Sequence, residues 1–266
     1  MKKVLVFLSL VLMGIALMGC ENGDGNVFTF KLFEDTEEYI TMVTEAGYAP
    51  YEYIENGEIK GVDIELGKEI AKKLHKNLRV INKNFDVLLI DIAAGNGADF
   101  SFAGMTPTPE RAKQVLFSNP YYDDAENSQV VLLKSDSSIS TLADLNSSSV
   151  RTGAQLGTVQ DELLNKFAPS SNKKIVQSLD ELFGELKEGF RDAIFTEKQV
   201  AEAFINQNGG AGQYKMIENI APEYSTSAGA VKLGNTELMN VINEVIAECL
   251  ASGKIEAWFI EHTQAE

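Results

Sequence analysis

The chain has 266 residues, of which 44% are hydrophobic and 23% are charged, a composition that excludes a disordered or fibrous protein. It carries 23 basic and 39 acidic side chains, which give a formal net charge of −16 at pH 7. Binding to nucleic-acid backbones requires a basic patch, so this balance argues against a nucleic-acid partner. The length is sufficient for two domains, each with a hydrophobic core of its own.

The N-terminus has the pattern of an export signal. Lys2 and Lys3 precede an apolar run from Val4 to Gly19. This run is shorter than the roughly 20 residues that a helix needs to cross a bilayer. A basic start, a short apolar segment and small residues at its end predict a signal peptide at residues 1–19. An uncleaved helical anchor is the alternative.

The apolar run ends in Leu17-Met18-Gly19-Cys20, which resembles the lipobox of bacterial lipoproteins. The resemblance implies cleavage before Cys20, which would carry a diacylglyceryl thioether and an N-terminal acyl chain such as palmitate. Several acyl chains hold a protein on a membrane, whereas one chain binds only marginally. Residues 20–27 would form a polar tether, and the folded body would be extracytoplasmic and anchored to the cell membrane. An ordinary signal peptide with a coincidental cysteine is the alternative.

Hydrophobic periodicity and turn signals alternate between strands and helices through the rest of the chain. Short apolar runs predict strands at Tyr39–Thr44, Tyr51–Ile54, Asp99–Ala103, Val130–Leu133 and Ala193–Phe195. Helices are predicted at 62–74, at Phe85–Ala94, after a capping box that begins at Ser178, and at Glu197–Asn206. An apolar stripe from Leu238 to Leu250 predicts a further helix that buries Cys249. This alternation predicts an α/β fold with largely parallel sheets.

The window from Ala103 to Arg111 has the pattern of an anion site. Thr108 is suited to cap a helix, and Pro109 is favourable at the first helical position. Arg111 in the first helical turn opposes the helix dipole, which suggests an anion nearby. Free backbone N–H groups, threonine hydroxyls and a guanidinium would together bind a carboxylate. A surface ion pair between Arg111 and Glu110 is the alternative.

Four segments in order along the chain resemble the family-3 solute-binding proteins of polar amino-acid ABC transporters. The segment Ala103–Tyr122, AGMTPTPERAKQVLFSNPYY, resembles the signature of that family. The other three are the loop Thr44–Tyr51 with an aromatic-x-Pro-aromatic pattern, the glycine–threonine turn at Gln155–Val159, and the strand Asp192–Glu197 with its acidic end. Together with Gly61–Asp63 and Phe85–Asp86, the resemblance covers about residues 39–260.

The resemblance implies an α/β, two-lobed, periplasmic-binding-protein-like fold (type II). In this fold a ligand cleft lies between two lobes that are joined by two crossovers. Lobe 1 is expected to comprise residues 28–124 and 225–266, and lobe 2 residues 125–224. The crossovers are expected near Asp123–Ser128 and Pro222–Ser227, where polar residues interrupt the pattern.

Carried over by position, the resemblance also implies a clamp for an α-amino acid. The ligand α-carboxylate would make a bidentate bond to Arg111, which a lysine could not provide. The ligand α-ammonium would bind Glu197 of the other lobe, where many relatives have an aspartate. Further contacts to the carboxylate are expected from Gly104, Thr106, Thr158 and Val159. A ligand with both groups bridges the lobes, so binding favours the closed state.

The ligand side chain is expected to lie between Tyr48 and Phe85, with Tyr51 as a weaker candidate that also suits the core. Glu45 matches a position where relatives often have an aspartate that faces the ligand. A carboxylate beside aromatic rings suits a cationic side chain, and it also suits an amide. Gln155 has two interpretations, a hydrogen bond to the ligand side chain or a residue of a surface turn.

The implied function is extracytoplasmic binding of a polar, cationic L-amino acid and its delivery to an ABC permease. Lysine, arginine, histidine or ornithine is favoured over glutamine or cystine, and the protein would act as a monomer without a cofactor. One alternative is an exported dehydratase that acts on cyclohexadienyl substrates such as arogenate, with Glu197 or Glu45 as the general acid. Another is the ligand-sensing partner of a membrane receptor. The clamp of Arg111 and Glu197 favours binding without catalysis.

The sequence does not predict a metal site or a disulfide within the chain. His75 and His262, the two histidines, belong to no cluster with metal-ligand spacing, and both are expected to be exposed to solvent. Cys249 is the single thiol that would remain after lipidation of Cys20. Gly209–Gly212 lacks the spacing of a phosphate-binding loop.

Overall fold

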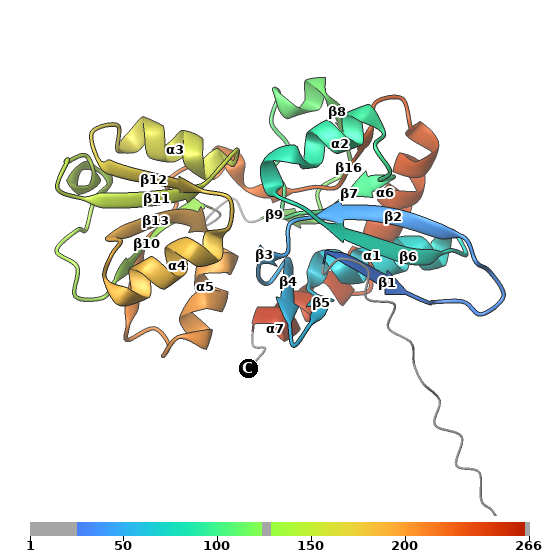
Figure 1. The fold of residues 1–266 in the computed structure, drawn as a ribbon, viewed down its shortest axis with the longest axis horizontal. Coiled ribbons are helices and arrows are strands. Elements are labelled where there is room, and N and C mark those ends of the chain that lie inside the picture. Colours follow the sequence, from blue (N-terminus) through green and yellow to red (C-terminus); the bar gives the residue numbers. More distant parts are fainter. Residues whose placement is uncertain (1–25, 124–128, 264–266) are drawn as a thin grey trace, which may run out of the picture.

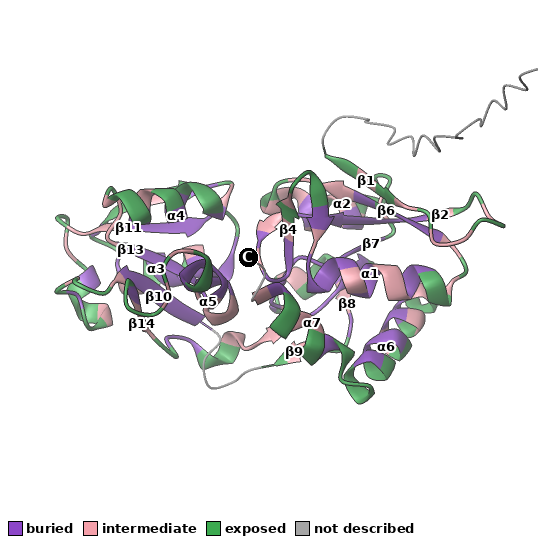
Figure 2. Cartoon of the chain, turned by 90° about the horizontal axis from the view of Figure 1, so that it is seen from below, coloured by how far each residue is buried: buried purple, intermediate pink, exposed green. Residues whose placement is uncertain are grey.

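The computed structural model describes residues 26–123 and 129–263, which form two lobes that lie side by side (Figure 1). Each lobe has a central sheet with helices on both of its faces (Figure 1). Buried residues gather on the sheet and on the inner sides of the helices in both lobes (Figure 2). The C-terminal helices return to the lobe that contains the first strands (Figure 1).

The sheet of the first lobe has six strands in the order β1-β6-β2-β7-β16-β8. These strands are β1 (Val27–Phe30), β6 (Asn77–Asn82), β2 (Tyr39–Thr44), β7 (Phe100–Ser101), β16 (Ala230–Lys232) and β8 (Val115–Phe117). β2 pairs in parallel with β6 and with β7, because helices α1 (Val62–Lys73) and α2 (Leu88–Ala94) carry the chain back between them. The β1–β6, β7–β16 and β16–β8 pairs are antiparallel.

The sheet of the second lobe has five strands in the order β12-β11-β13-β10-β14. These strands are β12 (Asn172–Val176), β11 (Arg151–Gln155), β13 (Ala193–Glu197), β10 (Gln129–Lys134) and β14 (Tyr214–Ile217). β11 is parallel to β12 and to β13, whereas β10 is antiparallel to β13 and to β14. Its helices are α3 (Val159–Phe167), α4 (Leu179–Glu188) and α5 (Lys198–Gln207).

The α/β class is confirmed, but the prediction of largely parallel sheets is wrong. Each sheet is parallel only where a helix connects neighbouring strands. The antiparallel pairs involve strands near the passages between the lobes, such as β10 and β16, and edge strands such as β1. Alternation of strand and helix along a sequence does not reveal these longer connections, so hydrophobic period alone could not predict them.

Two small sheets lie where the lobes meet. β3 (Gly47–Tyr48), β4 (Glu52–Glu55) and β5 (Glu58–Lys60) form an antiparallel three-stranded sheet beside the second lobe (Figure 1). β9 (Tyr122–Asp123) pairs with β15 (Thr226–Ser227), so two segments that connect the lobes run side by side. The residue limits given above for lobe 1 and lobe 2 stay a prediction.

The chain ends in helices α6 (Thr236–Ala251) and α7 (Lys254–Thr263). The predicted burial of Cys249 on α6 is confirmed, since its exposed fraction is 2%. The expectation that His262 is exposed is wrong. Its side chain is buried because α7 lies against β4, and its Nδ1 is 3.0 Å from the Tyr53 hydroxyl oxygen. His75 is exposed as expected and lies 3.1 Å from Asp35.

Two details at helix starts differ from the predictions. α4 begins after Ser178 as expected, but the Ser178 side chain makes no capping hydrogen bond. The helix expected after Thr108 is a single 3₁₀ turn at Arg111–Lys113, in which the Arg111 N–H donates to Thr108 Oγ1 at 3.2 Å. It stays short because strand β8 begins at Val115.

Gly229 lies at a tightly packed point between β15 and β16. A methyl group on Gly229 would lie 2.4 Å from Cζ of Phe102, which is fully buried. We expect Gly229→Ala to lower the free energy of unfolding by about 1–3 kcal/mol, the usual cost of overpacking. Gly184→Ala on α4 is the control, because nothing lies within 4 Å of its added methyl group and alanine is the better helix former. Equal unfolding free energies for the two variants in chemical denaturation would contradict the prediction.

Candidate ligand-binding site

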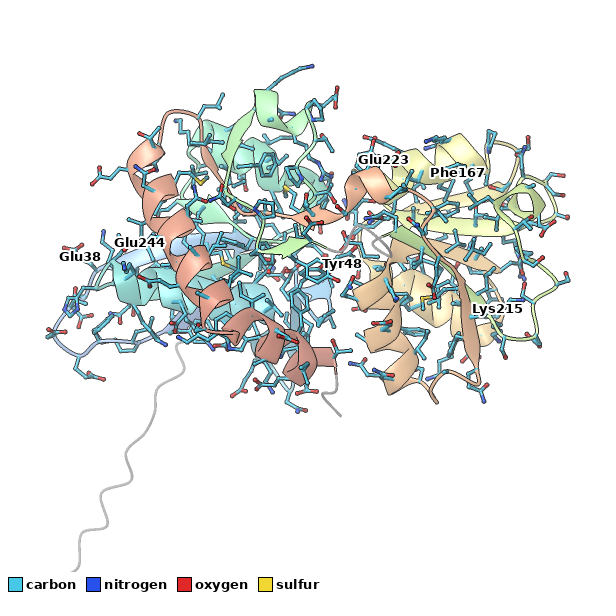
Figure 3. All side chains as sticks on the ribbon, turned by 180° about the vertical axis from the view of Figure 1, so that it is seen from behind. Glu38, Tyr48, Phe167, Lys215, Glu223 and Glu244 are labelled. Carbon is cyan, nitrogen blue, oxygen red and sulfur yellow. The ribbon has the colours of Figure 1, made fainter. Side chains whose placement is uncertain are left out.

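A cavity lies between the lobes, and its volume of about 250 Å³ includes space that is open to solvent. It is lined by every predicted ligand-binding residue except Glu45, and also by Ala103 and Gln160. The first lobe contributes Tyr48, Phe85, Ala103, Gly104, Thr106 and Arg111, and the second contributes Gln155, Thr158, Val159, Gln160 and Glu197. Tyr48 lies at the junction of the lobes in Figure 3. The fold therefore brings residues of both lobes to one site, whereas their contacts with a ligand stay a prediction.

Arg111 connects the lobes at one end of this cavity. Its Nη1 donates to the carbonyl oxygen of Thr106 at 2.7 Å, and its Nη2 donates to the carbonyl oxygen of Gly157 in the second lobe at 3.0 Å. The guanidinium also lies over the Phe85 ring, 5.3 Å from the ring centroid. Burial lowers the pKa of Arg111, but a guanidinium stays protonated in proteins. This end of the cavity therefore carries a lasting positive charge.

The N-terminus of α3 faces the same end of the cavity. Thr158 caps this helix, because its Oγ1 accepts from the Asp161 N–H at 3.2 Å and its hydroxyl donates to the carbonyl oxygen of Gln155 at 2.7 Å. The N–H groups of Val159 and Gln160, in the first turn, have no partner within the helix. These donors and the Arg111 guanidinium make an environment that suits a carboxylate.

Glu197 supplies the opposite charge. It lies at the end of β13, directly before α5, and its exposed fraction is 5%. Burial raises the pKa of Glu197 to about 8, and hydrogen bonds with Tyr51 and Gln129 oppose this rise. A cation beside such a buried carboxyl restores the charged form, so Glu197 is suited to hold an ammonium group.

Gly104 lines the cavity, but its N–H already donates a hydrogen bond within the protein. It donates to Asp63 Oδ2 at 2.9 Å, and the Tyr121 hydroxyl donates to the same oxygen at 3.0 Å. The expected help of Gly104 to a carboxylate therefore does not come from this N–H. The glycine is needed for its backbone φ of 52° and for space, because a methyl group there would lie 3.0 Å from Cε1 of Tyr48.

The two aromatic candidates come from different parts of the first lobe. Tyr48 belongs to β3 and stacks on Tyr51 at 5.7 Å between ring centroids, whereas Phe85 precedes α2. Tyr51 is fully buried and packs edge-on against Phe259 of α7. It is therefore part of the core, and its ring packs against the Tyr48 ring.

Glu45 and Gln155 form a further hydrogen-bonded contact between the lobes, and Gln155 also lines the cavity. Gln155 Nε2 donates to Glu45 Oε2 at 3.1 Å and to the carbonyl oxygen of Gln177 at 2.9 Å. Gln155 is buried at the end of β11, so its interpretation as part of a surface turn is wrong. Burial raises the pKa of Glu45 to about 7, the bond from Gln155 lowers it, and the charge of Asp180 raises it further.

The comparison with known proteins agrees with this geometry. The sequence model of the bacterial extracellular solute-binding proteins, family 3, matches residues 40–263. The chain belongs to this family. The two-lobed type II fold that the resemblance implied is thereby confirmed, as solved structures of the family share it.

Relatives of this solute-binding protein include a protein described as the arginine-binding extracellular protein ArtP of Bacillus subtilis (strain 168). The two are 32% identical over 97% of this chain and 98% of the relative. An ancestral arginine-binding protein solved with arginine is 33% identical, with a TM-score of 0.74 over 84% of this chain and 97% of that one. An ancestral arginine-binding protein solved with glutamine is also 33% identical, with a TM-score of 0.74 over 86% of this chain and 100% of that one.

Sequence reasoning missed Gln160 of this solute-binding protein. Its Nε2 donates to Gln129 Oε1 at 2.7 Å, and Gln129 lies opposite Glu197 in the β10–β13 ladder. Gln160 thus supports the acidic residue from within the second lobe. Its position in the first turn of α3, one residue after Val159, was the signal that could have identified it.

In residues 26–123 and 129–263, no three His, Cys, Asp or Glu side chains gather so that they could hold a metal ion. None of the helices in the described part of the chain has the length and apolar character that a membrane crossing requires. The predicted signal peptide and Cys20 lie outside the described residues.

Proposed function

We propose that this solute-binding protein captures a free L-amino acid with a cationic side chain, arginine above all, and delivers it to an ABC permease. The observation that carries the proposal is the pairing of Arg111 with the buried Glu197 across one cavity. An α-amino acid has both complementary charges, and its carboxylate and ammonium would contact different lobes. The arginine-binding relatives and the shared family support the same function.

The ligand would stabilise the closed arrangement of the lobes. With lobe 1 taken as 28–124 and 225–266 and lobe 2 as 125–224, Arg111 and Glu197 belong to opposite lobes. A ligand held by both gains its full interaction energy only when the cleft is closed, so binding shifts the population toward closure. This difference between open and closed forms is what a permease would recognise.

The preference for a cationic side chain follows from Glu45. Its carboxyl group is buried and accepts a hydrogen bond from Gln155, which lines the cavity, and we expect an arginine side chain to extend toward this pair. A guanidinium would pair with Glu45 and stack on aromatic faces, whereas the amide of glutamine would offer neutral hydrogen bonds only. Glutamine remains the competing ligand, because a similar ancestral protein was solved with it.

A thermal-shift screen tests this function. The probes are the twenty amino acids, ornithine and cystine, and titration calorimetry then measures the affinity of each ligand found. We expect arginine to give the largest shift, because a ligand that binds only the folded state raises stability with its affinity. A response to none of the cationic amino acids, or a larger one to glutamine, would contradict the proposal.

We also infer that the cleft binds its ligand without changing it. In the proposed complex Glu197 holds the ligand ammonium and Glu45 holds the cationic side chain. Neither of these two carboxyl groups is then free to act as a general acid. Incubation with prephenate or arogenate should therefore give no aromatic product. Product formation at a rate that Glu197→Gln abolishes would favour the dehydratase alternative instead.

We further propose that Cys20 anchors the exported protein to the cell membrane. Cys20→Ser should either block cleavage at this site or, where cleavage still occurs, release the protein from the membrane fraction. Release is expected because the acyl chains supply most of the membrane affinity of the mature protein. Fractionation of cells and mass spectrometry of the mature N-terminus measure the effect. An unmodified Cys20 in the mature wild-type chain would contradict this proposal.

Crosslinking of the wild-type protein in cells tests whether its partner is a permease, as transport requires, or a membrane receptor, as sensing requires.

A further inference from the structure

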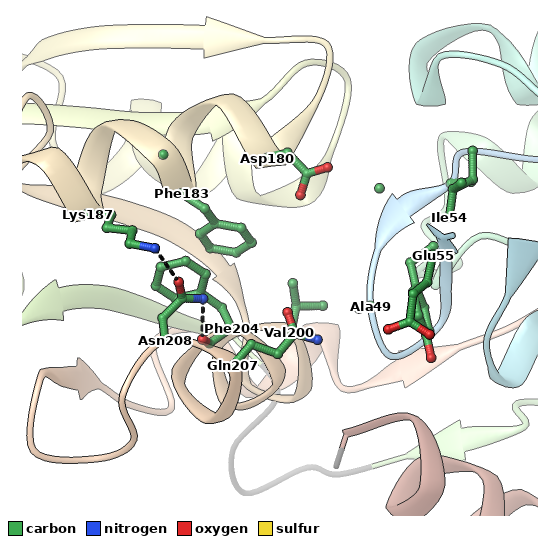
Figure 4. A pocket seen from close by; sticks show the side chains of 14 residues that line it. Ala49, Ile54, Glu55, Asp180, Phe183, Lys187, Val200, Phe204, Gln207 and Asn208 are labelled. Carbon is green, nitrogen blue, oxygen red and sulfur yellow. Dashed lines mark hydrogen bonds between the residues drawn. The ribbon is translucent and has the colours of Figure 1, made fainter. Parts of the chain in front are cut away.

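An open groove lies between the β3–β4 hairpin of the first lobe and helices α4 and α5 of the second (Figure 4). Its volume is about 1510 Å³, which includes solvent-accessible space. Gly47 lines the groove on the side of the first lobe, and Asp180 lines it on the side of the second. In Figure 4 the Asp180 carboxylate points from the start of α4 toward the first lobe. Gln155, which lines the inner cavity, donates to Glu45, whose Oε1 lies beside Gly47 of this groove.

Glu45 and Asp180 approach each other at Gly47. A methyl group built on Gly47 would lie 2.9 Å from Glu45 Oε1, 3.5 Å from Ser178 Oγ and 3.7 Å from Asp180 Oδ2. Because these distances start from one point, the two carboxylates face the same small space from opposite lobes. The exposed fraction of Glu45 is 7%, and the hydrogen bond from Gln155 reaches its Oε2, so Oε1 is the oxygen that faces this space.

The described residues provide no cation for these two carboxylates. In residues 26–123 and 129–263, no lysine, arginine or histidine forms an ion pair with Glu45 or Asp180. Lys187 also lines the groove, but its Nζ donates to Asn208 Oδ1 at 3.1 Å (Figure 4). The Asp180 side chain is exposed to solvent, and its charge contributes to the raised pKa of the buried Glu45. Two facing carboxylates that have no cation within the described chain are suited to an external one.

We propose that Asp180 determines ligand specificity by holding the cationic end of the ligand side chain together with Glu45 of the other lobe. This inference rests on the proposed function and adds a second contact to the side-chain end of the same site. A guanidinium has donors on both of its edges and can bond two carboxylates at once. A neutral side chain would leave two like charges facing each other as the lobes close. The pair would therefore favour closure on a cationic ligand and oppose closure on a neutral one.

Asp180 also suits a structural role, because it lies in the first turn of α4 and an acidic residue there stabilises a helix. Glu181 lies in the same turn and pairs with Lys174 instead. Glu181→Gln is therefore a matched control, which removes one negative charge from the same turn without changing the groove.

Calorimetric titration with L-arginine and with L-citrulline tests the proposal. Citrulline has nearly the shape of arginine but carries a neutral urea group in place of the guanidinium. Asp180→Asn should weaken arginine binding about tenfold, the usual difference between a charge-assisted and a neutral hydrogen bond, and should change citrulline binding less than about threefold. Asp180→Ser should give the same pattern, and Glu181→Gln should change neither ligand.

The outcomes separate this inference from the function on which it rests. Failure of the wild type to bind arginine would overturn the proposed function. Strong arginine binding that Asp180→Asn leaves unchanged, or an equal loss for arginine and citrulline, would overturn the role of Asp180 alone. A thermal unfolding curve for each variant shows that it is folded before the titration.

Discussion

Arg111→Ala is expected to weaken the binding of L-arginine by about 2–5 kcal/mol, or roughly 30-fold to several thousand-fold. The loss is large because the ligand carboxylate would be left in a buried site without its charged partner. The N-terminus of α3 would still attract an anion, but a helix end contributes only about 0.3–1 kcal/mol in most sites. Titration calorimetry of the folded variant measures the change.

Two further variants make this result specific. Arg111→Lys should recover only part of the affinity, because one ammonium cannot reproduce the planar donors that now reach Thr106 and Gly157. Lys113→Ala removes an exposed cation from the same 3₁₀ turn and should leave affinity within a few tenths of a kcal/mol. An Arg111→Ala variant that binds arginine as tightly as Lys113→Ala would refute the assignment of the carboxylate end.

Glu197→Gln is expected to weaken arginine binding by about 2–3 kcal/mol, because it would leave the ligand ammonium in a buried site without its charged partner. It should also reduce the pH dependence of binding. The pKa of Glu197 is raised to about 8 and that of Glu45 to about 7. Below these values both groups hold protons, and a cationic ligand must displace them. Wild-type affinity should therefore rise between pH 5.5 and 7.5 and fall as the pH is lowered.

Glu188→Gln is the control for this prediction. Glu188→Gln changes the net charge equally on the exposed side of α4, and its affinity and pH profile should match those of the wild type. Arg111, whose charge lowers the pKa of Glu197, stays protonated throughout this range. A wild-type affinity that does not change with pH would mean that Glu197 is already ionised without ligand.

The sequence was most informative where one residue type has one physical use. An arginine at position 111 opposes the dipole of the helix expected there, which suggests an anion site but leaves a surface ion pair with Glu110 as the alternative, and the resemblance to the family decided between them. The hydrophobic pattern likewise predicted a buried strand at Ala193–Phe195, and the resemblance to the family extended it to Glu197. Pattern and resemblance together predicted Arg111 and Glu197, which the fold brings to one cavity from different lobes.

The remaining features depend on contacts between distant segments. Gly104 uses its N–H for Asp63, which lies 41 positions earlier in the chain, and no local pattern reports such a bond. His262 is buried because the last helix packs against Tyr53. In the sequence Asp180 is only one residue of the predicted capping box that begins at Ser178. It approaches Glu45 only because the two lobes lie side by side in the folded protein.

The hydrogen-bonded pair of β9 and β15 affects the entropy that is lost when the lobes close on a ligand. A single flexible link would let the lobes twist, slide and tilt independently, and a ligand would have to arrest all of these motions. Two strands joined by a ladder resist twisting and sliding, and they leave mainly one swinging motion. Fewer degrees of freedom are lost when the cleft shuts, so more of the contact energy is retained as affinity.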